Sequence, residues 1–87
     1  MGLKKINDLS LLLLHLTGWE ENDRQNEGLK IERSWKGYLF ECLNTLEEEK
    51  MIRQFQNTKS VIVTHEGRVK AEKLKSIVFN ALEEAGL

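Results

Sequence analysis

The stretch that decides the fold reads SWKGYLFECLNTLEEEKMI (34–52), RQFQNTKSVIVT (53–64) and HEGRVKAEKLKSIVFNALEEA (65–85). In its first part Leu39, Leu43 and Leu46 recur at helical spacing, with Lys50 at the end of the same face. This periodicity predicts an amphipathic helix over residues 37–50 that packs on a core.

The pattern changes directly after this helix. Residues 51–56 and 60–64 are short runs suited to strands, and Asn57-Thr58-Lys59 between them favours a turn. We therefore expect a hairpin over 51–64. Thr64 is suited to cap a C-terminal helix over 65–85, in which Gly67 would permit close packing.

The N-terminal third predicts one further helix, over residues 7–17, and then a loop. Leu9, Leu12, Leu13 and Leu16 share a helical face that we expect to be buried, whereas Leu11 and Leu14 point elsewhere. A helix that is apolar nearly all round is buried on two sides, so Leu11 and Leu14 are candidates for a dimer contact. Phe79 lies outside the apolar stripe of the last helix and is a third candidate. Residues 19–33 are polar and acidic and predict a solvated loop that Gly28 ends, after which Leu29 and Ile31 begin either a short turn of helix or a short strand.

Length and composition restrict the class of protein. A chain of 87 residues has material for one hydrophobic core, and 40% apolar residues are enough for it to fold. The single cysteine forms no internal disulfide, which favours the cytoplasm. The leucine-rich run is too short to cross a bilayer, so no membrane partner is expected.

The segments W-K-G-Y (35–38), L-N-T-L-E-E-E-K-M-I (43–52) and K-S-V-I-V-T-H-E-G (59–67), in this order, resemble the winged helix-turn-helix superfamily. More narrowly, they are similar to short bacterial winged-helix-like proteins of unknown function. The resemblance implies an α+β, mainly α fold with three to four helices and a two-stranded hairpin wing. It also implies that residues 38–50 are a recognition helix and residues 57–59 the tip of the wing.

This resemblance favours binding of double-stranded DNA by a module similar to transcription regulators. The net charge is −1, but residues 51–70 carry four bases and one acid. The candidate phosphate contacts are Lys36, Arg53, Lys59 and Arg68, and Asn44 is a candidate for reading an adenine edge.

Acidic side chains on the same helix oppose this hypothesis. Glu41, Glu47 and Glu48 would face a duplex that carries one negative charge per about 1.7 Å. The alternative is a winged helix that binds a protein partner or forms a homodimer without binding DNA.

An enzyme is the least favoured class. His15 lies within a leucine run, and His65 stands beside Glu66 at a helix start, where a solvated pair is the simpler interpretation. Neither histidine has a cysteine at zinc-ligand spacing, and the six glycines form no phosphate-binding loop. We therefore expect no catalytic residue, metal or cofactor.

Overall fold

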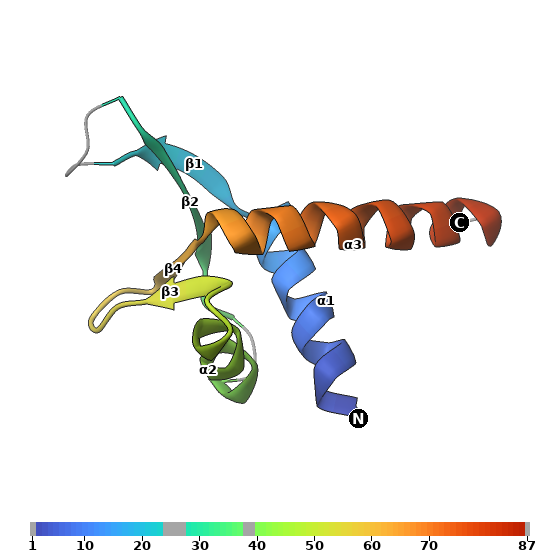
Figure 1. Ribbon diagram of the computed structural model, residues 1–87, viewed down its shortest axis with the longest axis horizontal. Coiled ribbons are helices and arrows are strands. Elements are labelled where there is room, and N and C mark those ends of the chain that lie inside the picture. The colour runs from blue at the N-terminus through green and yellow to red at the C-terminus, as the bar shows by residue number, and fades with distance from the viewer. Residues whose placement is uncertain (1, 24–27, 38–39, 87) are drawn as a thin grey trace.

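The computed structural model describes residues 2–23, 28–37 and 40–86. Within these ranges the chain forms three helices and one four-stranded antiparallel sheet (Figure 1). The elements are α1 Gly2–Leu16, β1 Trp19–Asn22, β2 Lys30–Trp35, α2 Phe40–Glu48, β3 Ile52–Gln54, β4 Ser60–Val63 and α3 His65–Glu84. The fold is α+β, with a four-stranded sheet where the sequence predicted a mainly α fold with a two-stranded wing. None of the helices in the described ranges is long and apolar enough to cross a bilayer.

The predicted winged helix-turn-helix is wrong, because the segment expected to be an acidic loop forms half of the sheet. Strands β1 and β2 pair as an antiparallel hairpin from Trp19 opposite Arg33 to Asn22 opposite Lys30. A helix-turn-helix needs a helix before its recognition helix, and here that position holds two strands.

The second hairpin is confirmed as strands but does not project as a wing. Strand β4 pairs with β3 on one side and with β2 on the other, so the strand order is β1-β2-β4-β3. Each residue of β4 from Ser60 to Val63 has a partner on β2. The hairpin is therefore joined to the body of the sheet along the whole length of β4.

The core lies between one face of this sheet and the three helices. The cluster at its centre consists of side chains that contact one another and are each at most 5% exposed, namely Leu11, Leu14, Leu43, Leu46, Ile52, Val61, Val63 and Ala71. The strand residues among them alternate along the chain, as the period of a strand requires. We call the face that they form the inner face and the opposite one the outer face.

The two later helices agree well with their predicted positions. Helix α2 is shorter than the expected 37–50; Leu43 and Leu46 are buried as predicted, while Leu39 lies outside the described residues. Helix α3 begins one residue after its predicted cap, since the Thr64 hydroxyl accepts a hydrogen bond from the Gly67 N–H at 3.0 Å.

The buried face of α1 differs from the prediction. Of the four leucines expected in the core, Leu12 is buried, whereas Leu9, Leu13 and Leu16 are 40–50% exposed. Two of the residues buried in their place are polar, Asn7 and Ser10. Hydrophobicity alone could not indicate the correct face, because leucines surround the helix.

Candidate functional site

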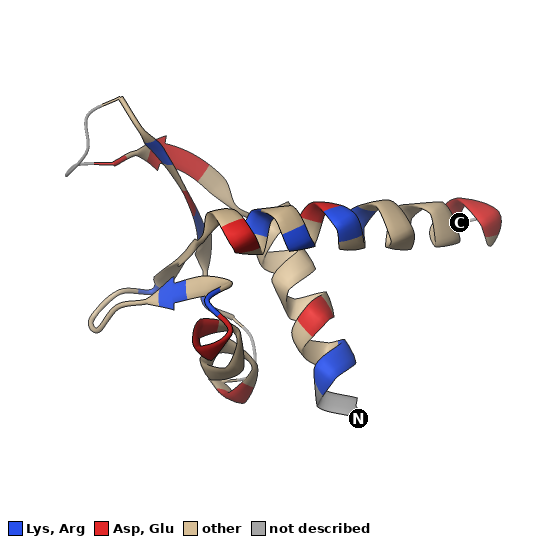
Figure 2. Cartoon of the chain, viewed as in Figure 1, with Lys and Arg blue, Asp and Glu red and all other residues tan. Residues whose placement is uncertain are grey.

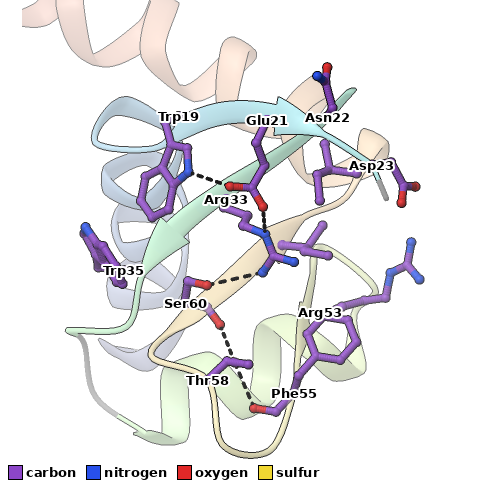
Figure 3. Close-up of a pocket in the computed structure, with 12 residues that line it drawn as sticks. Trp19, Glu21, Asn22, Asp23, Arg33, Trp35, Arg53, Phe55, Thr58 and Ser60 are labelled. Atoms are coloured by element: carbon purple, nitrogen blue, oxygen red, sulfur yellow. Dashed lines mark hydrogen bonds and ion pairs between the residues drawn. The ribbon is translucent and has the colours of Figure 1, made fainter. Parts of the chain in front are cut away.

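The outer face of the sheet forms the wall of an open cavity of about 700 Å³ (Figure 3). Aromatic, aliphatic and arginine side chains from all four strands line it together with several polar groups. They are Trp19, Glu21, Asn22, Asp23, Ile31, Arg33, Trp35, Arg53, Phe55, Thr58, Ser60 and Ile62. None of the three helices contributes a residue to this lining, so the cavity belongs to the sheet and its loops.

Strand pairing arranges these side chains in rows across the sheet. Arg33 on β2 and Arg53 on β3 are both opposite Ile62 on β4, and Trp19 on β1 is opposite Arg33. Neighbouring strands are about 4.8 Å apart, so an aromatic ring, a guanidinium group, an aliphatic side chain and a second guanidinium group follow one another at this interval.

A second row contains the two most exposed aromatic rings among those that line the cavity. Trp35 is opposite Ser60, and Phe55 extends β3 by one residue on the far side of the same serine. Trp35 is 61% exposed and Phe55 is 41% exposed. The centroids of Trp35 and Trp19 lie 4.9 Å apart in a tilted arrangement that fixes the two indoles against each other.

Ion pairing holds Arg33 in the middle of the face. Its Nε donates to Glu21, and its Nη1 donates to the Ser60 hydroxyl at 3.3 Å (Figure 3). The Trp19 indole N–H donates to the other oxygen of Glu21 at 3.2 Å. The β1 side of the outer face is thereby preorganised.

Three of the predicted phosphate contacts gather at the opposite end of this face. Lys36 donates its backbone N–H to the Lys59 carbonyl at 2.8 Å, and its ammonium lies 3.4 Å from the Phe55 carbonyl. Arg53 lines the cavity itself, and Lys59 is exposed at the loop between β3 and β4. The bases at positions 36, 53 and 59 therefore flank the rings of Trp35 and Phe55.

The other two predicted nucleic-acid contacts lie elsewhere. Asn44 is on α2, where its side-chain oxygen accepts a hydrogen bond from Gln54 at 3.0 Å. Arg68 is on α3 and donates to Glu32 and Glu20. The structure does not bring these two residues to the outer face.

A partly buried polar network lies on the other side of the sheet, around a smaller cavity of about 380 Å³. Glu32 is only 6% exposed and accepts hydrogen bonds from His15 at 2.7 Å and from Arg68 at 3.1 Å. The second ring nitrogen of His15 contacts Glu72 on α3. These contacts join α1, β2 and α3, and they satisfy the buried carboxylate of Glu32.

The network shifts the pKa of three of its groups. Burial lowers the pKa of His15, but hydrogen bonds to Glu72 and Glu32 outweigh burial, so the pKa is raised. The hydrogen bond with His15 lowers the pKa of Glu72, and the hydrogen bond to Glu32 raises that of Arg68. In the described ranges no three histidine, cysteine or acidic residues are arranged to hold a metal ion. We interpret the network as a structural clasp.

The candidates for a dimer contact are also placed by the structure. Leu11 and Leu14 have no exposed surface, so neither contributes to the outside of this fold. Both belong to the core cluster, so they do not form the dimer contact for which they were candidates. Phe79 is 41% exposed, and the Lys75 ammonium lies 5.7 Å from the centre of its ring.

A family described as a domain of unknown function, DUF6429, matches residues 3–84 of this chain. The chain belongs to the DUF6429 family. No curated protein matches, and no solved structure matches. The description of DUF6429 names no activity, so a function for this member has to be argued from its geometry.

Sequence reasoning missed most of the outer face of this DUF6429 chain. The segment 19–33, which contains Trp19 and Arg33, was expected to be a loop, and Trp35 entered only through the resemblance of W-K-G-Y. A signal was nevertheless present, since Ile31, Arg33 and Trp35 alternate with Glu32 and Ser34 at the period of a strand. The pattern was obscured because the residues buried on the inner face of this strand are polar.

Proposed function

We propose that this protein is a non-enzymatic binding module that holds single-stranded nucleic acid on the outer face of its sheet. One observation carries this proposal: exposed aromatic rings and basic side chains share one uncovered face. The exposed rings are those of Trp35 and Phe55, and the half-buried ring of Trp19 lies against Trp35. The bases are Lys36, Arg53 and Lys59, together with Arg33, which is paired with Glu21.

These two kinds of side chain match the two parts of a nucleotide. Aromatic rings provide a surface for unstacked bases, and each stacked base contributes about 1–3 kcal/mol. Arginine and lysine neutralise the phosphates that connect the bases. Because Trp35 and Phe55 are separated by one strand, two bases could stack at positions about 10 Å apart. Lys36 follows Trp35 and its ammonium lies 3.4 Å from the Phe55 carbonyl, whereas Arg53 lies two residues before Phe55.

The charges of α2 favour a single strand on the sheet over a duplex on this helix. Helix α2 contains three acidic residues, Glu41, Glu47 and Glu48, and no lysine or arginine. Both of its ends are red in Figure 2. Asn44 is held by Gln54, so its amide would have to leave that partner to read a base. We therefore assign nucleic-acid binding to the outer face of the sheet and not to α2, the expected recognition helix.

The proposal is tested by fluorescence anisotropy with a labelled strand of about 12 nucleotides and with the same sequence as a duplex. We expect the single strand to bind more tightly and to lose affinity between about 50 and 200 mM salt. Arg53→Ala and Lys59→Ala should each reduce the slope of log K against log salt by about one. Lys5→Ala removes an exposed base from α1 and is the matched control, with an unchanged slope. A duplex bound as tightly as the single strand would contradict the proposal.

A protein partner for the same face is the second candidate. The specific observation in its favour is that Glu21 and Asp23 line the β1 end of the cavity, where they would repel phosphates. An apolar partner would contact the rings and be largely insensitive to salt. Absence of binding to either nucleic acid at the lower salt concentration would favour this candidate.

A further inference from the structure

The Glu21 carboxylate joins two donors on the outer face of the sheet. One of its oxygens accepts a hydrogen bond from the Trp19 indole N–H at 3.2 Å, and the other accepts from the Arg33 Nε–H (Figure 3). Trp19 is opposite Arg33 in the strand register, so the two donors come from neighbouring strands. Together they form a site for an anion that presents two oxygens, and a side chain of β1 occupies it in this structure.

Both donors are also held by contacts that do not involve Glu21. The centroid of the Trp19 ring lies 4.9 Å from that of the Trp35 ring, and the Arg33 Nη1 donates to the Ser60 hydroxyl at 3.3 Å. The Arg33 side chain is only 24% exposed, so its neighbours on the sheet restrict its movement. The two N–H groups would therefore remain close together if the Glu21 carboxylate left them.

The chemistry of these donors fits a phosphate as well as a carboxylate. An arginine donates to the oxygens of either group, and such charge-assisted hydrogen bonds are stronger than those between neutral groups. The Glu21 side chain is 44% exposed and lines the cavity, so a ligand on the outer face can reach it. A phosphate that approaches Arg33 therefore meets a carboxylate of the same sign of charge that already uses the same donors.

Arg53 provides a comparison within the same row of side chains. Arg33 on β2 and Arg53 on β3 flank Ile62 on β4, which is opposite both. Arg53 is exposed, and no hydrogen bond or ion pair joins it to another described residue, whereas Arg33 is paired with Glu21. The charge of Arg53 is therefore available to a phosphate, and the charge of Arg33 is neutralised by Glu21.

We propose that the Trp19 indole N–H and the Arg33 guanidinium form a second phosphate site beside Arg53, and that Glu21, by occupying this site, limits the affinity of the outer face for a single strand. This inference rests on the proposed function, since it concerns the same ligand on the same face. A bound strand either displaces the Glu21 carboxylate or leaves Arg33 unused, and binding is weaker in both cases than it would be without this charge.

The test measures the affinity of charge variants of the full chain for the labelled single strand, between about 50 and 200 mM salt. Glu21→Gln removes the charge that neutralises Arg33, so the variant should neutralise one further phosphate. We expect the affinity at the lower salt concentration to rise about fivefold and the slope of log K against log salt to steepen by about one. Glu21→Ala should give the same changes, because it also releases both donors.

Glu20→Gln is the matched control. Glu20 precedes Glu21 on β1 and pairs with Arg68 of α3, away from the outer face. This variant has the same net charge as Glu21→Gln but releases no donor at the cavity, so its affinity should stay within about twofold of the unmodified chain and its slope should not change. Arg33→Ala added to Glu21→Gln should abolish the gain, because the released guanidinium is then absent. Circular dichroism should give the same spectrum for all of these proteins.

The possible outcomes separate this inference from the function on which it rests. If the unmodified chain binds the strand and Glu21→Gln binds no more tightly than Glu20→Gln, the second phosphate site is overturned and the proposed function stands. A gain that persists after Arg33→Ala would also overturn the site, because the gain would then come from lost repulsion alone. Absence of single-strand binding by all of these proteins would contradict both proposals.

Discussion

The two faces of the sheet are made by the same strands but have opposite properties. On the inner face Ile52 and Val61 have no exposed surface and contact the helices, whereas on the outer face Trp35 is 61% exposed and Phe55 is 41% exposed. Successive residues of a strand point to opposite faces, so a shift of one position exchanges the two environments. The inner face therefore stabilises the fold, whereas the outer face is accessible to a ligand.

The largest difference is expected between two isoleucines at equivalent places on the two faces. Ile52 is fully buried, and Ile52→Ala should lower the free energy of unfolding by about 2–5 kcal/mol, because it removes core contacts and leaves a cavity. Ile62 is half-buried on the outer face, and Ile62→Ala should cost about 1 kcal/mol. Urea denaturation measures both values. Equal losses would show that the outer face is covered in solution.

A glycine on the inner side provides the next test. A Cβ atom at Gly67 would lie 2.1 Å from the Met51 carbonyl oxygen, so Gly67→Ala has to separate α3 from the segment before β3. We expect a loss of about 1–3 kcal/mol in the free energy of unfolding. Gly37→Ala is the control, because a Cβ atom there meets nothing within 4 Å. Thermal unfolding of the two variants should give clearly different midpoints.

The clasp behind the sheet predicts how stability depends on pH. The raised pKa of His15 contributes stability that is complete below the ordinary value of 6.5 and is lost as pH rises through the pKa in the folded state. The lowered pKa of Glu72 contributes stability above its ordinary value of 4.5, and this is lost as pH falls. The pair therefore stabilises the fold most between about pH 4.5 and 6.5.

Urea midpoints measured across this range test the clasp. In the unmodified protein the midpoint should decrease as pH rises above 6.5, and His15→Gln should remove this decrease because glutamine carries no titrating proton. His65 is exposed at the start of α3, so His65→Gln is the control and should retain the decrease. A decrease that persists in His15→Gln would assign it to another group.

The smallest effect on stability is expected for the exposed ring at the centre of the proposed site. Trp35→Ala removes the contact with Trp19 but opens no cavity in the core, so the loss should be about 0.5–1.5 kcal/mol. Chemical denaturation checks this value. A loss as large as that of Ile52→Ala would show that Trp35 is chiefly a structural residue.

The sequence predicted the elements whose signals are local. The start of α3 was predicted to within one residue, because Thr64 caps the helix through its own hydroxyl and Gly67 follows at the required spacing. The hairpin at 51–64 was predicted from its turn residues, and Asn57 has the positive φ of 63° that such a residue tolerates.

The first hairpin was missed because its burial depends on distant residues. Glu32 and Ser34 occupy the inner face of β2, where a pattern of hydrophobicity would require apolar side chains. Glu32 is buried because His15 of α1 and Arg68 of α3 provide its hydrogen bonds, and no local pattern contains that information. Because β1 and β2 were not predicted, no sequence pattern indicated that the rings of Trp19, Trp35 and Phe55 share one face of a sheet.

The most direct test of the central claim combines binding and stability in one variant, Trp35→Ala with Phe55→Ala. If the outer face binds single strands, the affinity of this variant for a labelled single strand should fall at least tenfold, while its free energy of unfolding should decrease by no more than about 2–3 kcal/mol. Phe79→Ala removes an exposed ring from α3 and should leave the affinity unchanged. Unchanged affinity in the double variant, or an equal loss in Phe79→Ala, would contradict the assignment of binding to the outer face.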